Sequence, residues 1–158
     1  MAQYKNYTLK KYLDSLSEKA PVPGGGSASA LCAALGAGLL SMVVNYSLGK
    51  GASKKIEKRL LRILKEMERI KKRLLDLVDL DAEAYLEVVK ARRGTQREKL
   101  KAQSRARAIP LEVARLCFGA VQAAPIIVKN GNKYLLSDVE VALELLLASF
   151  NAAQVLAR

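Results

Sequence analysis

Histidine and tryptophan are absent from this chain of 158 residues, and aromatic residues make up only 5% of it. Histidine is the commonest general base near neutral pH and the commonest protein ligand of transition metals. Its absence argues against zinc chemistry and removes the usual proton carrier of an active site. The scarcity of aromatic side chains also leaves few platforms on which nucleic-acid bases could stack.

Cysteine is scarce as well, because only Cys32 and Cys117 occur, far apart in apolar surroundings. This arrangement is typical of buried, reduced thiols rather than of a disulfide or a metal-binding pair.

The N-terminal segment MAQYKNYTLKKY has no apolar core of a signal peptide, so we expect a cytoplasmic protein. The length predicts a single domain over residues 1–158 with room for a hydrophobic core.

Acidic residues are too few to balance the basic ones, and the formal net charge is +12. Most of the lysines and arginines lie between Lys50 and Arg107. A basic domain of this kind can bind nucleic acid, but here glutamates are interleaved with the basic residues, and Tyr85 is the only aromatic residue in the region. The alternatives are a solvated helix face or a surface that attracts an anionic small molecule.

No segment shows a strand period long enough to predict a β-strand, so the chain is expected to be helical throughout. The expected helices cover residues 8–19, 27–48, 54–92, a segment from 95 toward 129, and a last segment after 137. We therefore predict an all-α, up-and-down bundle of about five helices with one long central helix hairpin.

Helix boundaries are predicted from capping boxes and prolines. Thr95 with Glu98 is expected to open the fourth helix, and Ser137 with Glu140 the last one. Two prolines, at positions 110 and 125, each remove a hydrogen bond from the fourth helix, which is therefore expected to be kinked or broken twice.

The segment from Ser27 to Leu48 is apolar all round and long enough to invite a transmembrane interpretation. Its glycine, alanine and serine content, together with Asn45, makes it only weakly hydrophobic. We therefore predict a central bundle helix, covered by its neighbours and partly by a second subunit. Small residues on one face would let another helix approach closely: Ser29, Ala33, Ala37 and Ser41.

The third helix carries a heptad seam of apolar residues, which predicts packing against neighbouring helices. The seam consists of Ile56, Leu60, Ile63, Met67, Ile70, Leu74 and Leu77. Continuing the same spacing places Asp81 at a core position, followed by Ala84 and Val88. A buried carboxylate needs a partner or a proton, and burial raises its pKa toward the range useful for acid–base catalysis. Asp79 lies about 200° away around the helix, so the two carboxylates are not expected to share a proton within one subunit.

Three consecutive glycines, Gly24, Gly25 and Gly26, follow two prolines at the start of the second helix. They let the chain bend and let its backbone approach another group closely. Ser27 is expected to cap the helix, and the neighbouring backbone amides could hold an anionic or carbonyl oxygen. A plain cap and turn is the alternative.

Three further sites are candidate functional sites, and each also has a purely structural explanation. Asn45 could form a hydrogen bond across the bundle or line a pocket. The loop 130–132 could be a simple turn. Ser137 suits a helix cap and Asp138 suits the positive end of the helix dipole.

Several motifs, in order along most of the chain, resemble one family. They are the P-x-P-GGGS turn from Pro21 to Ser27, Ser41-Met42-Val43 with Gly49-Lys50, the segment from Leu77 to Tyr85, Ile109-Pro110-Leu111, and Asn130-Gly131-Asn132 with Ser137-Asp138. This pattern resembles the cyclodeaminase domain of formiminotransferase-cyclodeaminase and the related bacterial methenyltetrahydrofolate cyclohydrolases.

The resemblance implies a homodimeric one-carbon folate enzyme with sites near the subunit interface. It implies hydrolysis of 5,10-methenyltetrahydrofolate to 10-formyltetrahydrofolate, or cyclisation of 5-formiminotetrahydrofolate with release of ammonia. Neither reaction requires a metal or a redox cofactor, and a polyglutamylated folate would suit the basic surface. A stand-alone chain without a formiminotransferase domain favours the cyclohydrolase.

The resemblance also suggests roles for individual residues. Asp81 is the expected acid–base group, and Asp79, Asn45 and Ser27 would position the reactants. Substrate contacts are expected from Gly24, Gly25, Gly26, Asn130, Gly131, Ser137 and Asp138. The alternative to an enzyme is a non-catalytic basic helical protein that binds nucleic acid or another helical protein.

Overall fold

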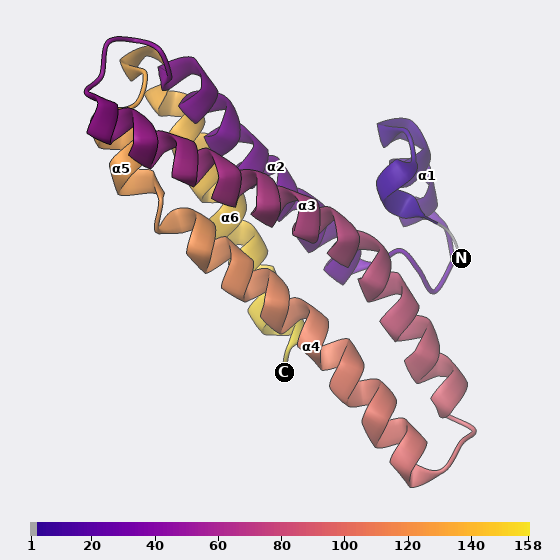
Figure 1. The fold of residues 1–158 in the computed structure, drawn as a ribbon. Coiled ribbons are helices and arrows are strands. Elements are labelled where there is room, and N and C mark those ends of the chain that lie inside the picture. The colour runs from indigo at the N-terminus through magenta and orange to yellow at the C-terminus, as the bar shows by residue number, and fades with distance from the viewer. Residues whose placement is uncertain (1–2) are drawn as a thin grey trace.

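The computed structural model describes residues 3–158, and this part of the chain is a helical bundle without β-strands (Figure 1). Its elements are η1 (Tyr4–Asn6), α1 (Leu9–Ser17), α2 (Gly25–Ser47), α3 (Lys54–Ala91), α4 (Gln96–Val121), α5 (Ala124–Asn130), η2 (Lys133–Leu135) and α6 (Leu136–Leu156). The four long helices α2, α3, α4 and α6 run alternately up and down. The predicted all-α, up-and-down bundle is therefore confirmed.

Helix α2 packs against α3 on one side and against α6 on another. The small residues predicted to permit close packing, at positions 29, 33, 37 and 41, are all buried. At Gly36 a Cβ atom would lie only 2.9 Å from Leu146 Cγ and 3.0 Å from the Ala142 carbonyl oxygen of α6. The short side chains of α2 thus set the distance at which its neighbours pack.

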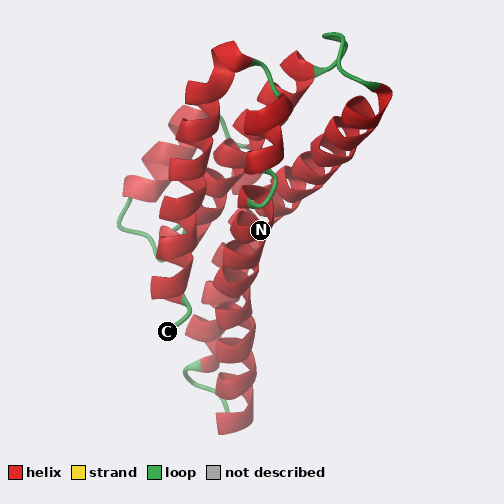
Figure 2. Cartoon of the chain, turned by 90° about the vertical axis from the view of Figure 1, so that its left-hand side faces the viewer, coloured by secondary structure: helices red, strands yellow, loops and turns green. Residues whose placement is uncertain are grey.

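Helix α3 uses the predicted heptad seam. Leu60, Met67, Leu74 and Leu77 are fully buried, and the seam reaches Ala84 at its far end. Figure 2 shows that α3 and α4 form a long hairpin whose tip projects beyond the other helices. The bidentate ion pair between Arg73 of α3 and Glu112 of α4 ties the two helices together in the middle, with distances of 2.8 and 2.9 Å.

Two predicted boundaries differ from the structure. Helix α4 passes through Pro110 without a break, and the chain is interrupted only before α5, where Pro125 occupies the first turn and needs no amide hydrogen. The capping box predicted at Ser137 is wrong, because α6 begins at Leu136 without a side-chain cap. Asn132 instead caps η2, where its side chain accepts a 3.0 Å hydrogen bond from the Tyr134 amide. The predicted Thr95–Glu98 box is confirmed.

By length and composition alone, three helical stretches are apolar enough to cross a membrane: Gly25–Ser47, Gln96–Asn130 and Lys133–Leu156. Most of the apolar residues of α2 are buried against α3 and α6, although Leu35 is 55% exposed. The other two stretches leave part of their apolar side chains on the surface, among them Phe118 and Leu147.

Candidate active site

The carboxylate of Asp81 is held at the start of α2. Its Oδ2 atom accepts a hydrogen bond of 2.9 Å from the backbone amide of Ser27. Asp81 lies in the C-terminal third of α3, where the heptad spacing turns it toward α2. Helix N-termini offer amides without intrahelical acceptors, and a carboxylate is the natural partner for them.

The glycine turn makes this approach possible. A Cβ atom on Gly26 would overlap the carboxylate of Asp81, whereas nothing lies within 4 Å of the corresponding positions on Gly24 and Gly25. Among residues 3–158 a positive φ angle occurs only at Gly49 and Gly51, so the triple glycine does not use its conformational freedom. The turn is needed for space: Gly26 admits the carboxylate, and Gly24 and Gly25 leave the surface beside it open.

Ser27 does not cap α2 as predicted. The N-cap is Gly24, and Ser27 lies in the first turn with its side chain fully buried. Its hydroxyl group instead forms a 3.0 Å hydrogen bond with the hydroxyl of Tyr12, a buried residue of α1. Ser27 therefore contributes its amide to Asp81 and its side chain to the attachment of α1.

The surroundings of Asp81 raise its pKa above the ordinary value of 3.8. Partial burial is the main cause, because removal from water disfavours the charged form, while the Ser27 amide opposes the shift by stabilising the carboxylate. A carboxyl group tuned in this direction is suited to accept and return a proton.

Asp81 and the glycine turn open onto a cavity of about 640 Å³, a size that fits small-molecule ligands. The cavity is lined by Pro21, Val22, Gly24, Gly25, Gly26, Asp81, Tyr85, Val88, Gln103, Ala106, Arg107, Pro110, Leu156 and Arg158. Among residues 3–158, Asp81 is the only acidic side chain of this lining. The sequence did not single out Gln103 and Arg107 of α4. Tyr85 could have been found, because it lies four residues after Asp81 and thus on the same face of α3.

Asp79 faces a different part of the molecule. It is buried, does not line the cavity, and its Oδ1 atom accepts a 3.2 Å hydrogen bond from the backbone amide of Lys5 in η1. The expectation that the two aspartates do not share a proton within one subunit agrees with this geometry. In the structure Asp79 fastens the N-terminal segment, and nothing places it near a reacting group.

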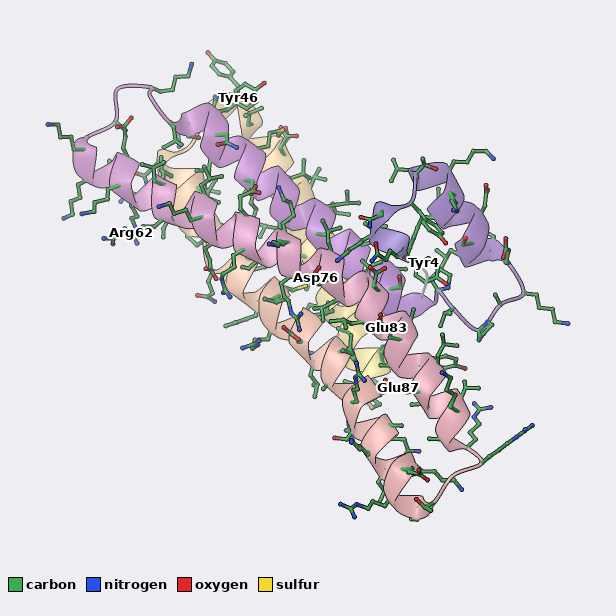
Figure 3. All side chains as sticks on the ribbon, turned by 45° about the vertical axis from the view of Figure 1, so that its right-hand side comes forward. Tyr4, Tyr46, Arg62, Asp76, Glu83 and Glu87 are labelled. Atoms are coloured by element: carbon green, nitrogen blue, oxygen red, sulfur yellow. The ribbon has the colours of Figure 1, made fainter. Side chains whose placement is uncertain are left out.

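The other predicted substrate contacts lie at the opposite end of α2. Asn45 is exposed and stands beside Tyr46, which Figure 3 shows at the end of the bundle remote from Glu83 and Glu87. The loop that contains Asn130 and Gly131 packs at the same end, where the Asn132 amide donates a 2.9 Å hydrogen bond to Ser47 Oγ. Ser137 and Asp138 follow at the start of α6.

None of these distal residues lines the cavity at Asp81, so one protomer does not bring them together with the glycine turn. Their predicted roles in substrate binding stay predictions.

Within residues 3–158, no three side chains of the histidine, cysteine, aspartate or glutamate type form a group that could hold a metal ion. The two cysteines are free, as predicted, but only Cys117 is buried, whereas Cys32 is partly exposed. Burial raises the pKa of the Cys117 thiol to about 12.

The fold and the cavity define a class of protein: an all-α bundle with a carboxylate held at a glycine-rich helix start beside a ligand-sized cavity. Residues 8–157 match the family described as formiminotransferase-cyclodeaminase. The chain therefore belongs to this family, and the predicted resemblance is confirmed.

Named relatives agree with this assignment. A methenyltetrahydrofolate cyclohydrolase from Methylorubrum extorquens is 34% identical, over 87% of this chain and 71% of that protein. A mouse formimidoyltransferase-cyclodeaminase is 30% identical over 85% of this chain, which spans only 27% of that longer protein. A solved structure, a formiminotetrahydrofolate cyclodeaminase from Thermotoga maritima, superimposes with a TM-score of 0.93 and 30% identity, over 97% of this chain and 77% of that one.

Proposed function

We propose that this protein hydrolyses 5,10-methenyltetrahydrofolate to 10-formyltetrahydrofolate and that Asp81 is its acid–base group. Family membership and the named relatives identify the chain as an enzyme of one-carbon folate chemistry. The observation that carries the assignment of Asp81 is its hydrogen bond with Ser27 at the mouth of the cavity.

The reaction needs a group that first accepts a proton and then returns it. Water adds to the amidinium carbon that joins N5 and N10, and Asp81 takes the proton that the attacking water loses. The resulting tetrahedral carbon carries a hydroxyl group. The bond between this carbon and N5 then breaks, N5 receives the proton from Asp81, and the hydroxyl proton is released to solvent. The formyl group stays on N10.

The substrate also suits the charge of the carboxylate. The methenyl carbon and its two nitrogens share a positive charge, which an ionised Asp81 attracts. This attraction decreases as the carbon becomes tetrahedral and neutral, so it serves binding rather than the chemical step. The raised pKa of Asp81 supports the chemical step, because it strengthens the carboxylate as a base.

Cyclisation of 5-formiminotetrahydrofolate is the second candidate, and the name of the Thermotoga maritima structure favours it. In that reaction N10 attacks the formimino carbon, and the amino group leaves as ammonia. The same tetrahedral arrangement forms, and Asp81 would protonate the leaving nitrogen. Neither route is expected to use a metal or a redox cofactor.

We further propose that the protein is a cytoplasmic homodimer. A groove of about 340 Å³ on the surface of α4 and α6 supports the dimer, because Glu144 is the only charged residue that the described part of the chain contributes to its lining. Phe118 and Leu147 in this groove are 60% and 51% exposed, and a second copy would remove them from water. A dimer is also the arrangement in which the loop around Asn130 can reach the cavity of another protomer. Light scattering of the wild-type protein and of Phe118→Glu tests this proposal, and a wild-type monomer at micromolar concentration contradicts it.

A polyglutamylated substrate is a separate proposal, supported by the net charge of +12. It predicts a lower KM for the pentaglutamate than for the monoglutamate, with a difference that shrinks as salt is added. Equal KM values at low salt would contradict it.

The test of the main proposal is a spectrophotometric assay with both folates. Loss of the methenyl chromophore, faster than the spontaneous reaction, supports hydrolysis. Appearance of that chromophore from 5-formiminotetrahydrofolate supports the cyclodeaminase. Turnover of neither, together with tight and salt-sensitive binding of RNA or DNA, would favour the non-catalytic alternative.

A further inference from the structure

Arg107 has a guanidinium group that the structure orients but leaves open to the cavity. It lies on α4, three residues before Pro110, and both residues belong to the cavity lining. Its Nε atom donates a 2.6 Å hydrogen bond to the carbonyl oxygen of Ala157, at the end of α6. The guanidinium is planar, and Nε is the atom that joins it to the rest of the side chain. A hydrogen bond at Nε therefore fixes the orientation of the two terminal nitrogens.

No carboxylate within residues 3–158 forms an ion pair with Arg107. Its neighbour Arg105 behaves differently, because it pairs with Glu87 of α3 outside the cavity. An oriented arginine without an acidic partner, in a ligand-sized cavity, has the geometry that recognises a carboxylate of a bound molecule.

The charges of the cavity are also separated. Asp81 lies on the wall formed by α2 and α3, whereas Arg107 lies on the wall formed by α4 and the end of α6, and the other basic lining residue, Arg158, follows the end of α6. A methenylfolate also carries opposite charges at different places: its amidinium is cationic, and its glutamate carries carboxylates at the other end of the molecule. The cationic end therefore belongs at Asp81, and the anionic end belongs at Arg107.

We propose that Arg107 binds a carboxylate of the substrate's glutamate and so fixes the direction in which the folate enters the cavity. This inference rests on the proposed function, because it assumes a folate in this cavity. Arg107 is a binding residue on this account, and the proton transfers belong to Asp81.

The experiment compares two substrates and four proteins. The substrates are 5,10-methenyltetrahydrofolate and 5,10-methenyltetrahydropteroate, which has the same reacting carbon but no glutamate. The proteins are the wild type, Arg107→Ala, Arg107→Lys and Arg97→Ala. Arg97 is the matched control, because it is an exposed arginine of the same helix that does not line the cavity.

For the wild type we expect a KM for the pteroate about ten- to hundred-fold above that for the folate, the effect of losing a charged hydrogen bond. Arg107→Ala should raise the KM for the folate by a similar factor and leave the KM for the pteroate and both kcat values unchanged. Arg107→Lys should fall between the wild type and Arg107→Ala for the folate. Arg97→Ala should match the wild type.

Three results would overturn the inference. The first is a KM for the folate that Arg107→Ala and Arg107→Lys both leave unchanged. The second is an equal rise in KM for both substrates, which would show that Arg107 shapes the cavity without contacting the glutamate. The third is an equal effect of Arg97→Ala, which would indicate general attraction of anions. In all three the wild type still turns over the folate, so the proposed function survives. If the wild type hydrolyses neither substrate, the proposed function is wrong, and this inference is wrong as well.

Discussion

Gly26 and Asp81 approach each other so closely that no side chain larger than hydrogen fits between them. The contact joins the first turn of α2 to the C-terminal third of α3, and the two residues are 55 positions apart in the sequence. Because of this close approach, the carboxylate lies within hydrogen-bonding distance of the Ser27 amide and lines the cavity. One glycine therefore serves both the packing of the bundle and the placement of the proposed acid–base group.

This contact predicts a strong effect of Gly26→Ala. The methyl group would displace the Asp81 side chain or separate α2 from α3, at a cost of about 1–3 kcal/mol in stability. Activity should fall at least about ten-fold, because the carboxylate leaves its position. Thermal unfolding and the methenyl assay measure the two effects.

Gly25→Ala is the matched control for stability. Nothing lies within 4 Å of the Cβ position at Gly25, and its backbone is helical. The variant should therefore unfold at or slightly above the wild-type temperature. If Gly25→Ala destabilises the protein as much as Gly26→Ala, the overlap with Asp81 is not the cause.

Ionised Asp81 should lower the stability of the folded state at neutral pH. Its folded pKa lies above the ordinary value of 3.8 because of burial, so its contribution to stability is greatest below that value and is lost as the pH rises through the folded pKa. Asp81→Asn removes the buried charge and keeps an oxygen that can accept from the Ser27 amide. We expect a higher melting temperature at pH 7, with a gain that disappears in acid. An equal or lower melting temperature at pH 7 would contradict this account of its pKa.

The pH dependence of hydrolysis follows from the same shift. Only ionised Asp81 can accept the proton of the attacking water, so kcat/KM should fall as the pH is lowered through its pKa. The midpoint of this fall should lie above 3.8, the ordinary aspartate value. The residual activity of Asp81→Asn, corrected for the spontaneous reaction, should lack this limb. A wild-type profile without an acidic limb at any pH where the protein is folded would exclude Asp81 as the base.

Cys117 should be unreactive in the folded protein. Burial raises the pKa of its thiol to about 12, so almost none of it is thiolate at pH 8. Iodoacetamide at that pH should label Cys117 only after unfolding, which peptide mass spectrometry detects, with free cysteine as the rate standard. Labelling of the native protein at a rate near that standard would contradict the burial of this side chain.

The sequence predicted those features that depend on a local pattern. The heptad spacing of α3 located the buried seam and placed Asp81 at the face that meets α2, because side chains seven residues apart point the same way. The small residues of α2 predicted close packing for an equally local reason. The Thr95–Glu98 box was predictable because both partners lie within one helical turn.

Other features depend on contacts between residues that are far apart in the sequence, and a local pattern does not reveal such contacts. Ser27 has the residue type of a cap, but Tyr12 takes its hydroxyl group and Gly24 ends up as the N-cap. Arg107 could not be distinguished from the other basic residues of its region, because its role depends on the Ala157 carbonyl 50 residues later. Asn45 was predicted to position the reactants together with Ser27, yet the length of α2 separates it from the glycine turn.

The most direct test of the central claim compares the two aspartates of α3 in the methenyl assay. Asp81→Asn keeps the shape of the site but cannot accept the proton of the attacking water. Asp79→Asn is the control, since Asp79 lies two residues away, is also removed from solvent, and accepts from Lys5 instead of facing the cavity. We predict that Asp81→Asn lowers kcat/KM at least about hundred-fold, while Asp79→Asn stays within about three-fold of the wild type. Full activity of a folded Asp81→Asn variant would contradict the account.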